Sequence, residues 1–423
     1  MRKSRMKPRA DQASVPAVVT LQMPLPVVEM FGAIEEHFFE LCVHTGQQVL
    51  QAMMEADRTR QCGPKWIADA ARTTQRAGSS SSAVTLGGRR IVVKRLRARS
   101  LAGAELRLPS FAWAAARDPL DRRTLEAVAI GVATRRYARS LDPLPADIEE
   151  RATSKSAVSR RFIARSAVLL DQWLARPLGA LDIVAVLIDG IYFDARCVLI
   201  ALGLDVNGHK HILGLHEGST ENTTVAKALL GDLIERGLDP ERPRLFVIDG
   251  GKGLRRAIRE LWGARALVQR CQVHKRRNVR DHLPEELHAR VLTAMHRAYD
   301  TPDAAQALAQ LERLARALER EHPGAATSLR EGLEETLTLQ RLGLTGALYR
   351  TLRSTNAIEN LNGSIATYAR NVKRWRDGHM VLRWVGAALH EASAHFRRLR
   401  GYRELPILVA ALAKLDKETK KAA

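Results

Sequence analysis

The chain has few cysteines, fewer acidic than basic residues, and no long apolar run. Its four cysteines, Cys42, Cys62, Cys197 and Cys271, are scattered, which argues against a disulfide framework and fits a reducing compartment. No stretch approaches the ~20 apolar residues that a membrane helix needs, so we expect no membrane partner. Lys and Arg outnumber Asp and Glu by 67 to 46, a net charge of +21. Because the excess is clustered, it predicts a polyanionic partner, most often nucleic acid, over a protein merely kept soluble by charge.

The first residues superficially look like a secretory signal. A basic start, residues 1–9, precedes a mildly apolar run, residues 17–28. Pro24 and Pro26 interrupt that run, and no cleavage site of small residues follows it. We therefore expect residues 1–29 to form a disordered basic arm.

The next segments predict a small helical domain and then a linker. Apolar residues at helical spacing indicate a helix over 30–56, and a second, short helix is expected over 66–76. The Gly-Ser tract at 78–82 is typical of a flexible linker. Residues 87–97 alternate basic and β-branched residues after a Gly-Gly turn. They fit either a basic hairpin that contacts a partner or an edge strand guarded by charge.

Residues 121–175 are expected to be mostly helical. Residues 124–139 form one amphipathic segment, and residues 154–162 resemble the turn and second helix of a helix-turn-helix. In that reading Arg160 and Arg161 contact the DNA backbone. An ordinary helical hairpin is the alternative.

Two apolar runs end in the same three residues, Ile-Asp-Gly. One is Val184–Gly190 and the other is Leu245–Gly250. A short, fully apolar run bounded by Gly predicts a strand buried on both faces, and α/β folds bind ligands where such strands end. If the strands are parallel neighbours, Asp189 and Asp249 converge. Because a bare carboxylate pair is costly without a cation, the pattern predicts a metal site.

The order of elements from residue 181 supports that arrangement. We expect three antiparallel strands, a helix, a strand, a helix and a strand, with an Asn207-Gly208 hairpin turn between strands two and three. The strands are expected over 184–189, 197–204, 211–215, 245–249 and 266–269. This is the element order of the ribonuclease H-like fold, in which the first and fourth strands are parallel neighbours.

A third oxygen ligand is expected after a helical insertion over 282–350. Glu359 opens the first helix beyond it and is the best candidate. Two divalent ions about 3.5–4 Å apart could then bind the attacking and leaving oxygens of a phosphoryl transfer. The alternative is that Asn356 and Glu359 form a capping box, in which case Glu359 only caps the helix.

Four segments together carry a resemblance to a known family. They are Leu187–Gly190, Val247–Gly251, Arg270–Val279 and Ser354–Asn362. In order and separation they resemble the Mutator-like bacterial insertion-sequence transposases of the insertion sequence 256 family, within the ribonuclease H-like Asp-Asp-Glu superfamily. The likeness runs from about residue 30 to 405. It departs at Arg353-Ser354-Thr355, where many relatives have an aromatic residue and two threonines.

The resemblance implies a fold and a set of partners. The fold is an α/β ribonuclease H-like core with a mixed five-stranded sheet, an all-α insertion domain and N-terminal α-helical DNA-binding domains. The implied triad is Asp189, Asp249 and Glu359, holding two Mg²⁺ (or Mn²⁺) ions. The partners are double-stranded DNA, both terminal inverted repeats and target, and further copies of the chain in a homodimer or larger synaptic complex. The place of action is the bacterial cytoplasm, at the nucleoid.

The Cys271-x-x-His274 pair is also shared with the family. We expect His274 to lie near the triad, where it contacts the scissile phosphate or orients a ligand. A buried structural pair is one alternative, and a zinc site, which needs two more ligands, is the other.

Two basic clusters are candidates for contact with DNA. The first lies beside the expected site and contains Lys275, Arg276, Arg277 and Arg280. The second contains Arg374 and Trp375, whose ring could stack on an unpaired base or belong to the core.

These features together predict a DNA transposase that binds terminal inverted repeats and catalyses strand cleavage and strand transfer. A structure-selective nuclease on the same core and a catalytically inactive DNA-binding derivative are the alternatives. The expected domains are an arm (1–29), an N-terminal helical domain (30–77), a linker with a basic strand (78–120), a helix-turn-helix-like domain (121–178), the first part of the core (179–281), the insertion (282–350), the second part of the core (351–405) and a Lys-rich tail (406–423).

Overall fold

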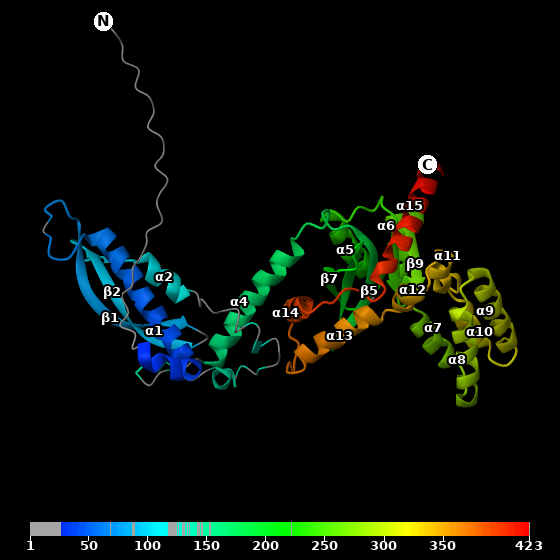
Figure 1. Cartoon of the computed structure of the whole chain (residues 1–423), viewed down its shortest axis with the longest axis horizontal. Helices are drawn as coiled ribbons and strands as arrows, with labels where there is room; N and C mark the ends of the chain where they lie inside the picture. The colour runs from blue at the N-terminus through cyan, green and yellow to red at the C-terminus, as the bar shows by residue number, and fades with distance from the viewer. Residues whose placement is uncertain are drawn as a thin grey trace, which may run out of the picture. The chain divides into compact units, whose positions relative to one another are not determined.

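The structure is a computed structural model that divides into two compact units. It describes residues 27–67, 69–86, 89–116, 154–220 and 222–422, with several residues between 125 and 151. Unit 1 comprises residues 1–124 and 135–157, and unit 2 comprises residues 125–134 and 158–423 (Figure 1). The expected basic arm lies outside the described residues up to position 26. Among the described helices, none is both long and apolar enough to cross a membrane.

Unit 1 packs one long helix and a shorter one on an antiparallel sheet. Its elements are α1 (Val27–Cys62), β1 (Thr74–Leu86), β2 (Arg89–Ser100), β3 (Glu105–Leu106), α2 (Pro109–Ala116) and β4 (Glu150–Arg151). Strand β2 pairs with each of the other three strands. The buried side chains of α1, among them Leu50 and Met54, share one apolar core with Val84 of β1 and Ile91 of β2.

Two expectations for unit 1 are wrong. The described residues of 66–76 form no helix, and the Gly-Ser tract at 78–82 lies inside β1 instead of forming a linker. The tract is a strand because its backbone pairs with β2, for example Ser81 opposite Lys94, and this pairing outweighs the low strand propensity of Gly and Ser. The Gly-Gly turn at 87–88 lies outside the described residues.

The expected helix-turn-helix corresponds in part to α4 (Lys155–Leu174), a single helix of 20 residues. Seven of residues 124–139, the segment that would supply the first helix, lie outside the described residues. Within unit 2, α4 packs through Phe162, whose ring centroid lies 4.6 Å from that of Trp384, and through Leu170. This face of α4 therefore serves to pack the helix on its own unit, and the helix-turn-helix stays a prediction.

Unit 2 is built on the mixed five-stranded sheet that the sequence predicts. The strands are β5 (Ile183–Phe193), β6 (Arg196–Asp205), β7 (Lys210–Gly218), β8 (Arg244–Ile248) and β9 (Ala266–Arg270), in the spatial order β7-β6-β5-β8-β9. Strands β5, β6 and β7 pair antiparallel, whereas β5–β8 and β8–β9 pair parallel. The first and fourth strands of the sheet are therefore parallel neighbours, as expected.

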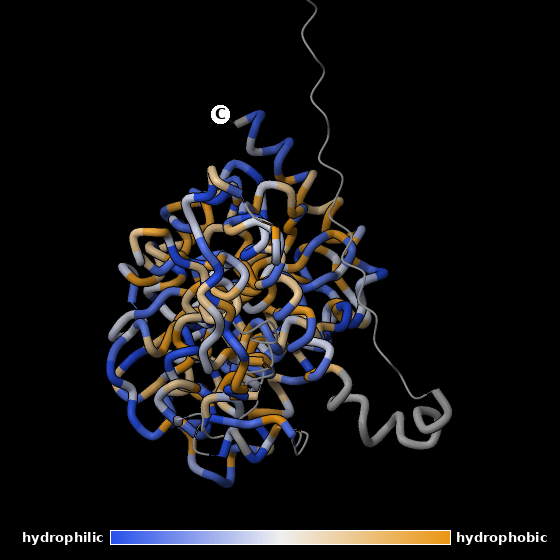
Figure 2. Tube along the Cα trace, turned by 90° about the vertical axis from the view of Figure 1, so that its left-hand side faces the viewer, coloured by the Kyte–Doolittle hydropathy of each residue, from blue (hydrophilic) through white to orange (hydrophobic). Residues whose placement is uncertain are grey.

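Helices cover both faces of this sheet. The helices of unit 2 after α4 are α5 (Thr223–Glu235), α6 (Lys252–Trp262), α7 (Gln272–Arg280), α8 (Glu285–Asp300), α9 (Ala304–Leu318), α10 (Pro323–Arg330), α11 (Thr338–Arg341), α12 (Gly346–Leu352), α13 (Asn356–Ala369), α14 (Gly378–Ala394) and α15 (Leu405–Ala422). Alternate strand residues enter two cores: Leu187 and Val247 pack with α13, α14 and α15, while Ile188 and Phe246 pack with α5 and α6. The last turns of α15 are hydrophilic (Figure 2).

The segment between α7 and α13 is helical, as the expected insertion requires. Helices α8, α9 and α10 share an apolar core of their own, which includes Met295, Leu311 and Leu329. Asp189 lies on β5 and Asp249 directly follows β8, whereas Glu359 comes after this helical segment, on α13.

Candidate active site

The sheet register brings Asp189 and Asp249 to the same level. The last parallel pair between β5 and β8 is Leu187 opposite Val247, so the two aspartates follow this pair by two residues on each strand. One detail differs from expectation, because β5 does not end at Asp189. It continues to Phe193, since its antiparallel pairing with β6 extends beyond the point where β8 leaves the sheet.

The backbone after Asp249 has little freedom. Gly250 has φ +111°, and a Cβ there would lie 2.1 Å from Nε of Arg270. Only glycine fits this position. The glycine of the second Ile-Asp-Gly is therefore required by the backbone turn that follows Asp249. The Asp249 carboxylate accepts a hydrogen bond from the backbone N–H of Gly251 at 2.8 Å.

The charges of the other two acids of the expected triad affect the pKa of Asp189. Burial raises the pKa of Asp189 to about 6, and the neighbouring charges of Asp249 and Glu359 act in the same direction. A carboxyl that is half-buried among like charges favours its neutral form. A cation bound at this place would reverse that preference.

Glu359 reaches the site from the first turn of α13. The helix begins at Asn356 with Thr355 as N-cap, and no side-chain capping bond forms, so the capping-box alternative is wrong. The Thr355 hydroxyl instead donates to Glu359 at 2.6 Å. The orientation of the Glu359 carboxylate is therefore set by the Thr355 hydroxyl.

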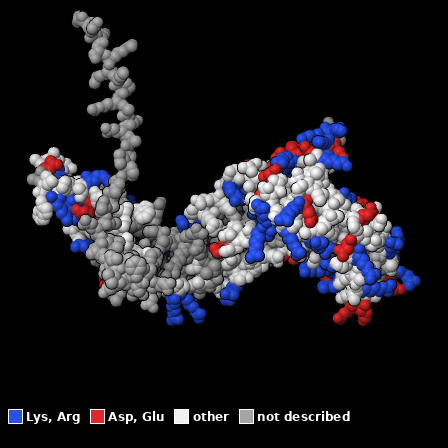
Figure 3. Space-filling model, viewed as in Figure 1, with Lys and Arg blue, Asp and Glu red and all other residues white. Residues whose placement is uncertain are grey.

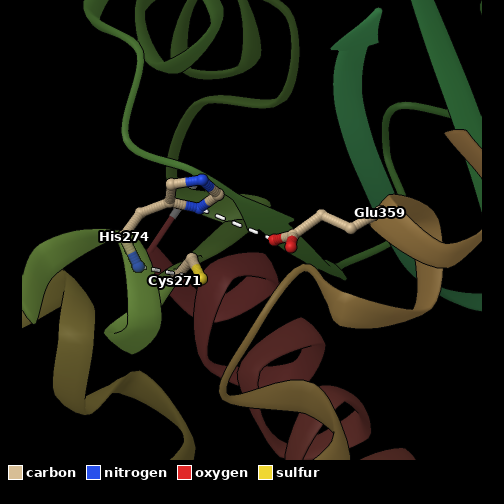
Figure 4. Close-up of side chains that lie close together, drawn as sticks. All are labelled: Cys271, His274 and Glu359. Carbon is tan, nitrogen blue, oxygen red and sulfur yellow. Dashed lines mark hydrogen bonds and ion pairs between the residues drawn. The ribbon is translucent and has the colours of Figure 1, made fainter. Parts of the chain in front are cut away.

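Cys271 and His274 lie beside Glu359 (Figure 4). Nδ1 of His274 is 3.8 Å from Oε1 of Glu359, and Cys271 Sγ accepts from the backbone N–H groups of His274 and Thr355. A hydrogen bond with Cys271 raises the pKa of His274, and the charges of Glu359 and Asp249 support this shift. Burial opposes ionisation of the Cys271 thiol, but hydrogen bonds from His274 and Thr355 outweigh it and lower its pKa.

The ligand atoms of Cys271, His274 and Glu359 lie within 4.8 Å of one another. Among the described residues, this is the one group of three or more Cys, His, Asp or Glu side chains close enough to share a metal ion. Asp189 and Asp249 are outside it. Three donors that include one buried thiol fall short of a closed zinc site, and Cys197 belongs to the core between the sheet and α5.

The donor chemistry around the strand edge suits a hard divalent cation. Asp189, Asp249 and Glu359 supply only carboxylate oxygens, which Mg²⁺ and Mn²⁺ prefer. Burial is the main cause of the raised pKa of Asp189, and the charge of Asp249 adds to it. The residues present therefore fit the expected ions, and the same three acids would hold them.

Lys275 was expected to contact DNA, and this expectation is wrong. The residue is fully buried, and its ammonium group donates to the backbone carbonyls of Ser328 and Glu331. Burial lowers its pKa to about 7. Lys275 thus fastens α7 to the helical insertion, because helical periodicity turns this position of α7 inward.

The other basic candidates lie nearer the surface. Arg160, Arg277 and Arg374 are exposed, Arg161 and Arg276 are half-buried, and Arg280 pairs with Asp281 at 2.9 Å. Lys and Arg are spread over the visible face of unit 2, with acidic groups between them (Figure 3). Trp375 packs edge-on against Phe193, with ring centroids 4.8 Å apart, which is the core packing that the sequence left open as the alternative to base stacking.

Two residues of the site escaped the sequence analysis. Thr355 holds Glu359, and Asn362 donates from Nδ2 to Oδ2 of Asp189 at 2.8 Å. The sequence feature that could have predicted Asn362 is its position three residues after Glu359, which places both side chains on one face of a helix.

Comparison with known proteins identifies the family of this chain. The model of the family described as "Transposase, Mutator family" matches residues 34–398. The transposase for insertion sequence element IS1081 of Mycobacterium tuberculosis is 28% identical over 297 residues, which cover 68% of each chain. The transposase for ISRM5 of Rhizobium meliloti is 30% identical over 59% of this chain and 63% of its own. The transposase for IS256 in transposon Tn4001 of Staphylococcus aureus is 26% identical over 63% and 68%. The chain belongs to the Mutator family of transposases.

Proposed function

We propose that this protein is a DNA transposase with a ribonuclease H-like core, which cuts DNA at the ends of its insertion sequence and joins these ends to a target. The observation that carries the proposal is that Asp189 and Asp249 follow the last residue pair of two parallel neighbouring strands by two residues each. The charge of Glu359, in the first turn of α13, also acts on the carboxyl of Asp189. The sheet order and the helical insertion before Glu359 support the choice of core.

The three acids would hold two Mg²⁺ or Mn²⁺ ions. When bound, such ions supply activation of the attacking hydroxyl and neutralisation of the phosphate charge. The protein's own part is positioning: strands β5 and β8 fix the two aspartates, and Thr355 fixes Glu359. His274, whose pKa is raised, would donate a hydrogen bond to a phosphate oxygen.

DNA is the partner that the basic surface and the family favour. The exposed arginines, Arg160, Arg277 and Arg374, together with Arg276, would contact the backbone of terminal repeats or target. Because both ends of the element must be held while they are cut and joined, the working form would be a homodimer or a larger synaptic complex. Cytoplasmic action at the nucleoid follows from the same substrate.

The test uses the full chain, Mg²⁺, and duplexes that carry the inverted repeats flanking its own coding sequence. Wild type is expected to nick at the repeat end and to join a pre-cut 3′-hydroxyl end to a plasmid. Asp249→Asn should abolish both reactions but keep DNA binding, measured by gel shift. Cleavage without joining would favour the nuclease, and binding without cleavage by wild type would favour the inactive derivative. Cleavage by Asp249→Asn at the wild-type rate would refute the metal site.

A further inference from the structure

Asn362 connects the two halves of the candidate site. It lies on α13, three residues after Glu359, and its Nδ2 donates to Oδ2 of Asp189 on β5 at 2.8 Å. This hydrogen bond joins residues 173 positions apart. It is a direct side-chain link between the helix that carries the glutamate and the strand that carries the first aspartate.

The other end of the same amide has no partner. Oδ1 of Asn362 is buried and accepts no hydrogen bond from any described residue. Turning the amide around would place Oδ1 against the Asp189 carboxylate, which has no proton to donate once it is ionised. A buried acceptor without a partner costs about 1–3 kcal/mol. An acceptor of this kind beside several carboxylates could take a hydrogen bond from a group or a water bound at the site.

The neighbours of Asn362 limit what that donor can be. The half-buried site is rich in carboxylates, with Asp189, Asp249 and Glu359 in one electrostatic neighbourhood, so an anion is disfavoured and a cation favoured. Mg²⁺ and Mn²⁺ keep several waters when carboxylates hold them, and each such water is a strong hydrogen-bond donor. An amide oxygen is an acceptor that fits these waters.

We propose that Asn362 is a positioning residue of the metal site. Its Nδ2 fixes one oxygen of Asp189 and leaves the other oxygen for a divalent cation, while its Oδ1 accepts a hydrogen bond from a water bound to that cation. The inference rests on the proposed function, since it needs a cation at the three acids. It adds a fourth side chain to the site and gives the buried acceptor a role.

The experiment measures Mn²⁺ binding to the full-length protein, by calorimetry and by the electron paramagnetic resonance signal of free Mn²⁺, without DNA turnover. Asn362→Leu removes both the donor and the acceptor, and we expect the dissociation constant to rise about 10- to 100-fold, as when an outer-shell partner of a metal ligand is lost. The matched control is Asn360→Leu, the same substitution at an exposed position of the same helix. It should bind Mn²⁺ as wild type does.

A second variant separates the two ends of the amide. Asn362→Asp keeps an acceptor oxygen but loses the donor and places a charge against Asp189. We expect it to unfold at lower denaturant concentration than wild type without metal, and to recover that stability when Mn²⁺ is added. Asn362→Leu should gain less from Mn²⁺ than wild type does, a difference that a purely structural role of Asn362 would not produce. If Asn362→Leu does not fold, Asn362→Asp alone decides the matter.

The outcomes distinguish this inference from the proposed function. If Asp189→Ala loses Mn²⁺ binding while Asn362→Leu binds like wild type, Asn362 has no part in positioning and the transposase proposal stands. If wild type binds no Mn²⁺, or if Asp189→Ala and Asn362→Leu both bind it unchanged, the metal site fails and the inference fails with it.

Discussion

Strands β5 and β8 of unit 2 and strands β1 and β2 of unit 1 place polar residues in opposite surroundings. The β5–β8 pair is parallel and apolar on both faces, and Leu187 and Val247 are fully buried. The β1–β2 pair is antiparallel and has one apolar face against α1, while its other face carries pairs such as Ser81 opposite Lys94. A charge is therefore costly at the end of the first pair and inexpensive on the second.

Two carboxylates show this difference directly. In unit 1, the hydrogen bond from Arg97 lowers the pKa of Glu105 to about 2, with help from Arg99. In unit 2, burial and the charge of Asp249 raise the pKa of Asp189 to about 6. Glu105 is paired with arginines, whereas the hydrogen bond that Asp189 accepts from Asn362 does not offset the burial of its carboxylate. A half-buried carboxyl with a raised pKa, such as Asp189, indicates a functional site more strongly than an exposed, ion-paired carboxylate such as Glu105 does.

The largest effect that would test this comparison is on metal-free stability. Asp189→Asn should raise the free energy of unfolding, because the folded state takes up a proton at Asp189 more readily than the unfolded chain does. The gain should be absent below pH 4, grow between pH 4 and 6 and level off above pH 6, at about 1–3 kcal/mol. Urea denaturation across this pH range measures it.

The matched control for that prediction is Glu105→Gln in unit 1. Because its pKa is lowered, the ionised carboxylate of Glu105 stabilises the fold, and its loss should destabilise unit 1 at neutral pH. A stability gain from Glu105→Gln, or a loss from Asp189→Asn, would remove the contrast between the two units.

An effect of similar size is expected from one truncation made in both regions. Val247→Ala should cost about 2–3 kcal/mol, since it removes buried methyl groups and leaves a cavity. Val92→Ala, on the half-buried face of β2, should cost less than about 1 kcal/mol. Denaturant midpoints of the two variants measure the difference, and equal costs would show that the two sheets are packed alike.

The same contrast explains which parts the sequence could predict. The strands of unit 2 were predictable because burial on both faces demands continuous apolar residues, and the glycines after Asp189 and Asp249 mark where these runs end. The Gly-Ser strand β1 was not, because its pairing with β2 is a long-range contact that local composition opposes. Glu359 is a candidate because it opens the first helix after the insertion, and the family likeness favours the triad over a capping role. Asn362 was missed because its partner, Asp189, is 173 residues away.

A third prediction concerns the basic residues of α7, where burial separates two neighbours in sequence. Arg277→Ala should weaken DNA binding equally for all sequences and reduce the slope of log affinity against log salt by about 0.9. Lys275→Met should leave that slope unchanged, because its ammonium group bonds to backbone carbonyls and not to the solvent side. Fluorescence anisotropy at several salt concentrations measures both, and a reduced slope for Lys275→Met would restore Lys275 as a DNA contact.

The smallest expected effect tests whether the hairpin of unit 1 contacts DNA at all. Lys94 is exposed on β2 opposite Ser81, and its side-chain ammonium group makes no hydrogen bond or ion pair within the described residues. If the hairpin is a DNA surface, Lys94→Ala should lower the salt slope by about 0.9, whereas Arg97→Ala should lower it less, because Glu105 already neutralises Arg97. If the charges only guard the sheet against other strands, neither substitution will change DNA affinity, and Lys94→Ala will instead promote self-association in sedimentation runs. The two hypotheses for the hairpin thus predict opposite results for DNA affinity and for self-association. Only the first would give unit 1 a part in DNA binding.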